Sequence, residues 1–322
     1  MKRSLSASLL EGNNSSKVPK SSYTFDYVSE LINNRLSDQL KSCLENSFKH
    51  INLKNDDSLL MKACKVGDEE CVKLLIAHGA DVSFVSHYSG YTALTLACRF
   101  GRESIAKLLL EHGGEINPET GLLPLVEACK AGNLDVAELL LNSGARVDEH
   151  PQVLCKDDSC YENRDDYDPH YHDGLNPIMI ASKTNHTGLV KLLLQHGAVE
   201  TILDDLPLDS YDIYGFSALT FASKCYHWET VKALITNKFN VDELNGAGTQ
   251  GSYHPSPLMY ACKQGDIEVV KELIELGADI NAARWESTEI SSALITASAR
   301  GHIDIVKFIL EHKNFTAVET VA

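Results

Sequence analysis

The fold is decided by residues 57–82, which read DSLLMKACKVGDEECVKLLIAHGADV and whose internal order returns six more times along the chain. Six of the seven copies open with a small polar residue, and every copy has an apolar turn with an Ala, usually a Gly or Asn, and then a second apolar run. The Ala is found at Ala63, Ala97, Ala128, Ala181, Ala222, Ala261 and Ala297. By subtraction these positions are 34, 31, 53, 41, 39 and 36 residues apart. Self-similarity at such a period is typical of a stack of one supersecondary unit.

Two helices account for the apolar positions of each copy, because those positions recur at i, i+3 and i+4. An aliphatic residue stands 12 places after the recurring Ala in every copy: Leu75, Leu109, Leu140, Leu193, Leu234, Leu273 and Ile309. Between the two helices, Gly67 and its counterparts fit the left-handed conformation of a tight reversal. Tyr226 occupies that place in the fifth copy and predicts a distorted turn there.

Small polar residues open six of the copies and are expected to cap the first helix. They are Ser58, Thr92, Asn176, Ser217, Ser256 and Ser292. Their side-chain oxygens can accept hydrogen bonds from the free backbone N–H groups of a helix start. Pro124, Pro177 and Pro257 are expected as first helical residues, where a missing donor costs little.

Three strings carry a family resemblance: residues 92–97 (TALTLA), 176–181 (NPIMIA) and 256–261 (SPLMYA). With their helix–turn–helix order they resemble the ankyrin repeat, whose opening reads T-P-L-H-x-A. The resemblance covers residues 57–313 and implies an all-α solenoid of helix–turn–helix–hairpin units with loop insertions. We expect seven such repeats there, a divergent N-terminal capping repeat at 23–56, a disordered tail at 1–22 and a C-terminal tail at 314–322.

Composition narrows the range of functions. The net charge of −16, from 45 acidic against 29 basic side chains, disfavours nucleic acid and anionic membrane surfaces and favours a basic partner. Cys64, Cys98, Cys129 and Cys262 directly follow the recurring Ala, where a thiol acts as a small apolar group and suits a reducing compartment. No apolar run is long enough to span a membrane. We therefore expect a cytoplasmic protein, with the nucleus as the other option.

The longest interruption of the repeat is the insertion at 149–173, EHPQVLCKDDSCYENRDDYDPHYHD, which contains eight acidic residues. Smaller insertions follow at 200–214, 243–253 and 282–290. All four come after a second helix and before the next opener, which is the hairpin side of the unit. Insertions confined to one face are typical of a binding face.

The same insertion contains Cys155, Cys160, His170 and His172, whose side chains are zinc ligands in proteins. Their spacing matches no standard zinc motif, so a solvated acidic loop is the favoured interpretation. A metal-binding or redox-sensing module is the alternative.

The resemblance implies a recognition scaffold without catalytic activity and without a cofactor, and no nucleophile or phosphate-loop motif is present. We expect a partner peptide or domain, a basic one, in the concave groove on the hairpin side. An alternative is that the chain is the recognition portion of a larger enzyme or channel. Aromatic and acidic residues of the insertions and hairpins are the candidate contacts, each with ordinary hairpin packing as its alternative. They are Tyr88, Tyr91, Tyr161, Asp165, Asp166, Tyr167, Tyr171, Tyr211, Tyr214, Tyr253 and Trp285.

Overall fold

The computed structural model describes residues 24–45, 51–52, 57–86, 89–119, 121–149, 175–199, 216–242, 255–286 and 289–316. These residues form sixteen helices and two short strands. The chain divides into two compact units, Met1–Asp81 and Val82–Ala322. The first copy of the repeat lies in the first unit, and the other six lie in the second.

The first unit contains two helix pairs. They are α1 (Phe25–Asn33), α2 (Ser37–Glu45), α3 (Leu59–Val66) and α4 (Glu69–Ala77). Helix α1 packs on α3 and α2 packs on α4, with Val28, Ile32 and Leu40 fully buried between them. The segment before the first copy therefore has the same helix-pair architecture as the repeats. Its role as a capping repeat stays a prediction.

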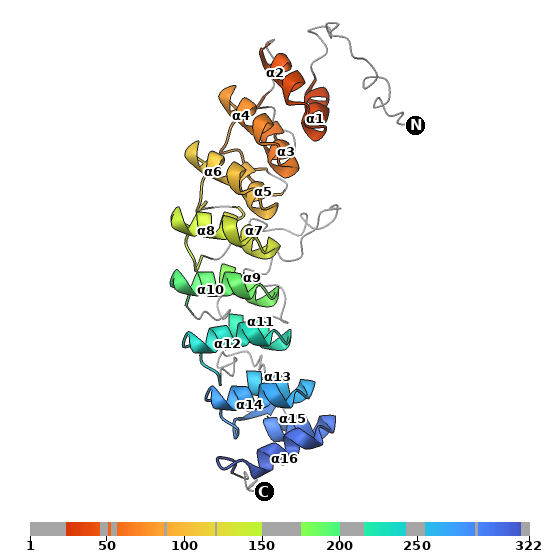
Figure 1. Ribbon diagram of the computed structural model, residues 1–322, viewed down its shortest axis with the longest axis vertical. Coiled ribbons are helices and arrows are strands. Elements are labelled where there is room, and N and C mark those ends of the chain that lie inside the picture. Colours follow the sequence, from red (N-terminus) through yellow and green to blue (C-terminus); the bar gives the residue numbers. More distant parts are fainter. Residues whose placement is uncertain are drawn as a thin grey trace, which may run out of the picture. The chain divides into compact units, whose positions relative to one another are not determined.

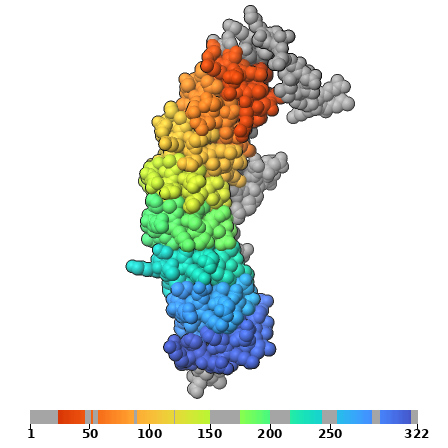
Figure 2. Space-filling view, in the orientation of Figure 1, coloured from red at the N-terminus to blue at the C-terminus, as the bar shows by residue number. Residues whose placement is uncertain are grey.

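The second unit is a stack of six helix pairs (Figure 1). Its elements are α5 (Ala93–Arg99), α6 (Glu103–Glu111), α7 (Pro124–Ala131), α8 (Leu134–Asn142), α9 (Pro177–Lys183), α10 (Thr187–Gln195), α11 (Ala218–Lys224), α12 (Trp228–Thr236), α13 (Pro257–Gln264), α14 (Ile267–Glu275), β1 (Ala283–Glu286), β2 (Glu289–Ser292), α15 (Ala293–Arg300) and α16 (Ile303–Glu311). First helices pack on first helices in chain order, from α5 on α7 to α13 on α15. In Figure 2 the colours of this unit accordingly follow one another in bands.

The two positions that recur in the sequence lie in the core. All seven recurring Ala residues are fully buried, and the seven aliphatic residues 12 places later are at most 2% exposed. A methyl group at the first position lets neighbouring first helices approach closely, and a branched side chain at the second fills the space between the helices of a pair. The repeat alignment made from the sequence is therefore confirmed.

The expected helix caps are also confirmed. The side chain of each of the six openers accepts a hydrogen bond from the backbone N–H three residues later, as Ser58 does from Met61 at 3.2 Å. Pro124, Pro177 and Pro257 are the first residues of their helices. In the third copy Leu123 stands at the cap and offers no side-chain acceptor.

The turn at Tyr226 is not distorted, so that prediction was wrong. Tyr226 adopts φ 61°, close to the 64° of Gly101 in the second copy. The hydrogen bonds also correspond: the Tyr226 N–H donates to Ser223 O at 3.1 Å, and the Gly101 N–H donates to Cys98 O at 3.2 Å. The packed helices on both sides impose the left-handed conformation on a residue that disfavours it.

Two short strands stand out from the helical architecture. Strands β1 and β2 pair antiparallel, with Trp285 opposite Ile290. They overlap the insertion that the repeat spacing places at 282–290. A pair of four-residue strands is too short to be stable alone, and β2 leads directly into α15.

Hairpin amides join successive repeats. The Asn117 amide donates to Gly144 O at 3.0 Å and accepts from the Arg146 N–H at 3.0 Å. Asn281 makes the same pair of bonds to Asn314 O and the Thr316 N–H, both at 2.8 Å. Each amide thus satisfies two backbone groups of the next repeat and fixes the spacing between hairpins.

Candidate protein-interaction site

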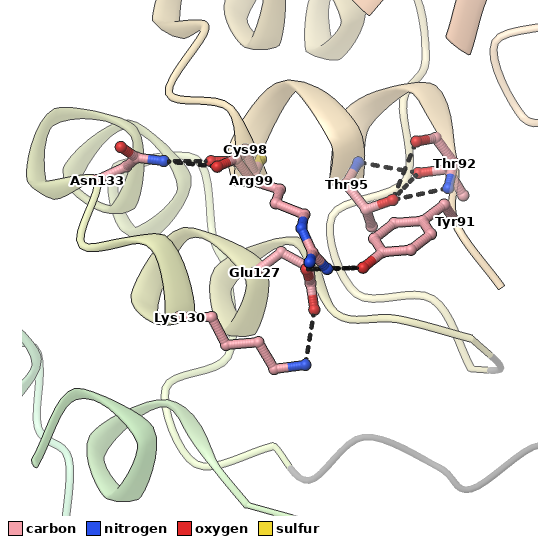
Figure 3. Close-up of polar contacts among 8 residues, drawn as sticks. All are labelled: Tyr91, Thr92, Thr95, Cys98, Arg99, Glu127, Lys130 and Asn133. Carbon is pink, nitrogen blue, oxygen red and sulfur yellow. Dashed lines mark hydrogen bonds and ion pairs between the residues drawn. The ribbon is translucent and has the colours of Figure 1, made fainter. Parts of the chain in front are cut away.

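Among the predicted partner-binding residues, the structure describes the side chain of Tyr91. This residue lies just before α5 and belongs to a polar cluster with residues of α5 and α7 (Figure 3). The Arg99 guanidinium donates to the Tyr91 hydroxyl and lies 5.4 Å from the centroid of its ring. The Tyr91 hydroxyl is 3.4 Å from Oε2 of Glu127. The aromatic ring is therefore held in place by charged neighbours, although it remains half-buried rather than enclosed.

Glu127 is the centre of this cluster and is fully buried. Its Oε1 lies 3.0 Å from Nζ of Lys130, and its Oε2 lies 3.3 Å from Nη1 of Arg99. A buried carboxylate is tolerated only when it is paired and hydrogen-bonded. Here two cations flank one carboxylate, so the cluster as a whole presents positive charge. The Arg99 side chain is 36% exposed and carries that charge to the surface.

The other predicted contacts are not brought together by the structure. The backbone of Trp285 lies in strand β1, not in an irregular loop. The remaining partner candidates lie outside the described residues: Tyr88, Tyr161, Asp165, Asp166, Tyr167, Tyr171, Tyr211, Tyr214 and Tyr253. The same is true of the zinc candidates Cys155, Cys160, His170 and His172. These predictions therefore stay predictions.

A row of cations was missed in the sequence, although the repeat alignment contains the signal. Two residues after the recurring Ala, five of the six copies in the second unit carry a basic residue: Arg99, Lys130, Lys183, Lys224 and Lys263. Each lies in the last turn of its first helix. The helix C-terminus favours a cation, which supplies a local reason for the row. The row nonetheless places a cation at the end of five successive first helices of an acidic chain.

Aromatic rings support the middle of this row. Phe216 and Phe221 stack with ring centroids 4.8 Å apart. The Lys183 ammonium lies 5.5 Å from the centroid of Phe221, and the Lys224 ammonium lies 4.7 Å from that of Phe216. The rings are buried, so the cation–π contacts order two lysines above an apolar base.

The core thiols have little of the thiolate character that chemistry would need. Burial raises the pKa of Cys64 and Cys129 well above the usual range, and it raises the pKa of Cys262 to about 12. Burial, together with the Asp68 carboxylate, raises the pKa of Cys71 to about 12. The thiolate is the reactive form, so these cysteines act as packing groups.

Two features are absent from the part of the chain that the structure describes. Within it, no group of three or more His, Cys, Asp or Glu side chains is arranged to hold a metal ion. None of the described helices has the length and apolar character needed to cross a membrane.

The architecture defines a class of protein: a helical repeat solenoid whose repeats are joined by recurring backbone and side-chain contacts. The family model for ankyrin repeats (three copies) matches residues 26–120, 60–151, 152–245, 207–284 and 241–319. The chain therefore belongs to the ankyrin repeat family. Ankyrin repeats generally mediate protein–protein interactions.

Several curated relatives and solved structures are similar to this chain. An ankyrin repeat and KH domain-containing protein of Caenorhabditis briggsae is 36% identical over 104 residues, which are 32% of this chain and 4% of the relative. Mask-1 of Caenorhabditis elegans, of the same description, is 26% identical over 166 residues, 42% of this chain and 6% of the relative. Ankyrin repeat and SOCS box protein 11 of Pongo abelii is 25% identical over 103 residues, 32% of this chain and 28% of the relative.

The similarity to one of the solved structures is evidence for the fold alone. The ankyrin repeat domain of human ASB11 superposes with a TM-score of 0.58 at 23% identity, over 78% of this chain and 97% of that domain. The curated matches span less than a third of any of the three relatives. Those relatives therefore inform the repeat and not the activity of a whole protein.

Proposed function

We propose that this protein is a non-catalytic scaffold or adaptor that binds a partner protein through its repeat stack. The observation that carries the proposal is the cluster of Tyr91, Arg99, Glu127 and Lys130, which holds a half-buried ring and a partly exposed cation in fixed positions next to two successive first helices. Side chains that are ordered before binding lose little conformational entropy when a partner docks.

The hairpin side of the stack is the proposed place for a basic peptide or domain. Eight acidic residues fall within 149–173, and the chain as a whole carries a net charge of −16. Opposite charges accelerate encounter and select among partners. A cytoplasmic or nuclear location fits this function, because the core cysteines occupy packing positions that need no disulfide.

The experiment compares the intact chain with a variant in which residues 149–173 are replaced by a short Gly/Ser link. Both are used for affinity capture from cell lysate, and captured partners are then titrated as purified proteins. Matching thermal melts establish that the deletion preserves the fold. We expect a basic partner that binds the intact chain and loses affinity for the deletion variant.

The contrasting result is a partner that binds both chains equally, with an affinity that does not depend on salt. That outcome would remove the insertion from the interaction surface. Trp285→Ala and Tyr91→Ala, measured with the same purified partner, then locate the contact along the stack.

A further inference from the structure

The last helix pair of the stack consists of α15 and α16 (Figure 1), and it leaves three large apolar side chains exposed. Ile295 is 47% exposed, Ile303 67% and Leu310 54%. The other exposed large apolar side chains that the structure describes lie one to a repeat: Phe100, Leu134, Val199 and Tyr226. Single exposed apolar residues are ordinary on a protein surface, whereas several in one place are typical of an interaction site.

The preceding repeats of the same unit cover the equivalent positions. Two residues before the recurring Ala, where the last repeat has Ile295, the side chains are at most 4% exposed: Thr95, Val126, Met179, Thr220 and Met259. Directly after that Ala, where the last repeat has the exposed Ser298, they are fully buried: Cys98, Cys129, Ser182, Ser223 and Cys262. The last pair therefore exposes positions that belong to the core elsewhere in the stack.

In those earlier repeats the next helix pair provides the cover. Six residues after the recurring Ala, Thr187 contacts Thr230 of the following repeat, with the two hydroxyl oxygens 2.8 Å apart. At the same position of the next repeat, the Trp228 indole N–H donates to Oε1 of Gln264 in the repeat that follows, at 2.8 Å. Ile303 is the equivalent residue of the last repeat, and among the described residues no helix pair follows it. Ile303 therefore faces the place that a following pair occupies in the earlier repeats.

The exposed side of α16 has the spacing of a helix-packing seam. Ile303, Val306 and Leu310 stand at i, i+3 and i+7, where apolar side chains line one side of a helix against a partner helix. Val306 is half-buried, whereas the equivalent residues of the preceding five repeats are fully buried. Second helices already pack on one another in the stack, as α14 does on α16. The exposed side of α16 thus has the residues to receive a further helix.

We propose that Ile295, Ile303, Val306 and Leu310, here called the terminal face, form a dimer interface that packs against the terminal face of a second molecule of this protein. The contacts between repeats show what fits this face, namely the apolar side of another pair of short helices. A second molecule presents such a side on its own last repeat. Its first unit does not, because no described residue of that unit is an exposed large apolar side chain. The pairing is therefore isologous and closes with two molecules.

The charges of the two helices are compatible with this occupant. Helices α15 and α16 carry two basic side chains, Arg300 and Lys307, and two acidic ones, Asp304 and Glu311. All four are exposed. A border of balanced charge can complement the same border of a second molecule. The net charge of −16 belongs to the whole chain, and exposed charges are screened beyond about 8 Å at physiological ionic strength. We therefore expect the association to depend little on salt.

The inference goes beyond the proposed function and does not depend on it. A dimer formed through the last repeats leaves the hairpin side of both molecules in place. Two hairpin sides in one assembly allow a partner with two binding segments to bind with avidity, without any new contact.

Sedimentation equilibrium of the intact chain over a series of concentrations tests the proposal. We expect the mass to rise with concentration from 35.4 kDa toward twice that value, with little difference between low and high salt. Leu310→Lys should raise the dissociation constant of the dimer by about 10-fold or more, as for loss of an interface hot spot. Val199→Lys is the matched control, because Val199 is 55% exposed on another repeat and receives the same charge. It should leave the dissociation constant unchanged.

Two double variants separate association from folding. Ile303→Lys with Leu310→Lys, and Ile303→Glu with Leu310→Glu, should each be monomeric. Both should melt at the temperature of the dilute parent, because the two side chains are exposed in the single molecule. An equimolar mixture of the two should recover the dimer mass, because opposite charges then meet across the terminal faces, and salt should weaken that mixed dimer. Recovery places both positions at the contact.

Three outcomes would overturn the proposal. The first is a parent chain that stays monomeric at every concentration, which would leave the terminal face to another occupant, such as a helix of a different protein. The second is a double Lys variant that dimerises as tightly as the parent, which would place the contact elsewhere. The third is association that continues beyond two molecules, which would exclude the closed arrangement. Loss of partner capture by a chain that still dimerises would count against the proposed function alone.

Discussion

Replacing Asp242 by Asn should stabilise the protein, because this residue occupies the hairpin position at which Asn117 makes two bonds. The Asp242 carboxylate accepts from the Asp279 N–H at 2.8 Å. Asn117 accepts the equivalent bond and also donates to the carbonyl of a helix-ending glycine, Gly144. Gly277 supplies the corresponding carbonyl for position 242, and a carboxylate cannot donate to it.

The size of the expected stabilisation by Asp242→Asn follows from one gained hydrogen bond and one removed charge. A net intramolecular hydrogen bond contributes about 1 kcal/mol. Burial raises the pKa of Asp242 above its ordinary value of 3.8, the Asp279 N–H bond lowers it, and the Asp279 charge raises it again. We therefore expect Asp242→Asn to raise the free energy of unfolding at pH 7 by about 1 kcal/mol, with the removed charge adding to that.

The sign of the pH dependence is a second check. A carboxyl whose folded-state pKa is raised holds its proton more tightly in the folded protein than in the unfolded chain. Its favourable contribution is complete below pH 3.8, the unfolded value, and is lost as the pH rises through the folded value. The advantage of Asp242→Asn over the parent should therefore shrink as the pH is lowered from 7 toward 4.

The assay is urea unfolding followed by circular dichroism at several pH values, combined with hydrogen exchange of the Asp279 amide. The amide measurement is needed because long repeat arrays can unfold in parts. Asn117→Asp is the reciprocal control and should destabilise by about 1 kcal/mol or more, because Gly144 loses its donor. A loss of stability in Asp242→Asn, or a gain that does not change with pH, would refute the reasoning.

Other predictions test the core and the loop. Leu140→Ala should lower the free energy of unfolding by about 2–5 kcal/mol through the cavity it leaves, and an unchanged denaturation curve would contradict the repeat alignment. Ser182→Ala and Ser223→Ala should each stabilise the protein by up to about 1 kcal/mol, because both hydroxyls are buried without a hydrogen-bond partner among the described residues. Calorimetry of the two variants tests this prediction. Cys225 is exposed and should react with iodoacetamide long before the buried Cys64, by mass spectrometry of the folded chain. Elemental analysis of the purified chain should find no stoichiometric zinc. One zinc ion per chain that is lost in the double variant Cys155→Ser, Cys160→Ser would instead establish the zinc alternative.

The helices and their caps could be predicted from the sequence because the same constraint acts seven times. A buried Ala and a buried aliphatic residue 12 places later recur in every copy, so a single ambiguous residue does not change the alignment. Cap residues such as Ser58 act on their own helix and need no distant partner. Local information repeated at a fixed interval is what pattern analysis detects best.

What the sequence did not reveal depends on contacts between repeats. Glu127 is paired with Arg99, 28 positions earlier, and neither residue alone signals a buried ion pair. The propensity of tyrosine predicts a distorted turn at Tyr226, yet the helices on both sides hold this residue in the left-handed conformation that glycine adopts in other copies. In both cases tertiary packing overrides the preference of the single residue.

Net charge misleads about partners for a similar reason. The value of −16 is a sum over the whole chain, whereas exposed charges act over a Debye length of about 8 Å at physiological ionic strength. A partner that touches Arg99 and Lys130 therefore responds to those two cations and to the Glu127 carboxylate between them, not to the sum over the chain. A chain with a large negative net charge can therefore still present a local pair of cations, as it does around the buried Glu127, and neither its composition nor its family would predict that pair.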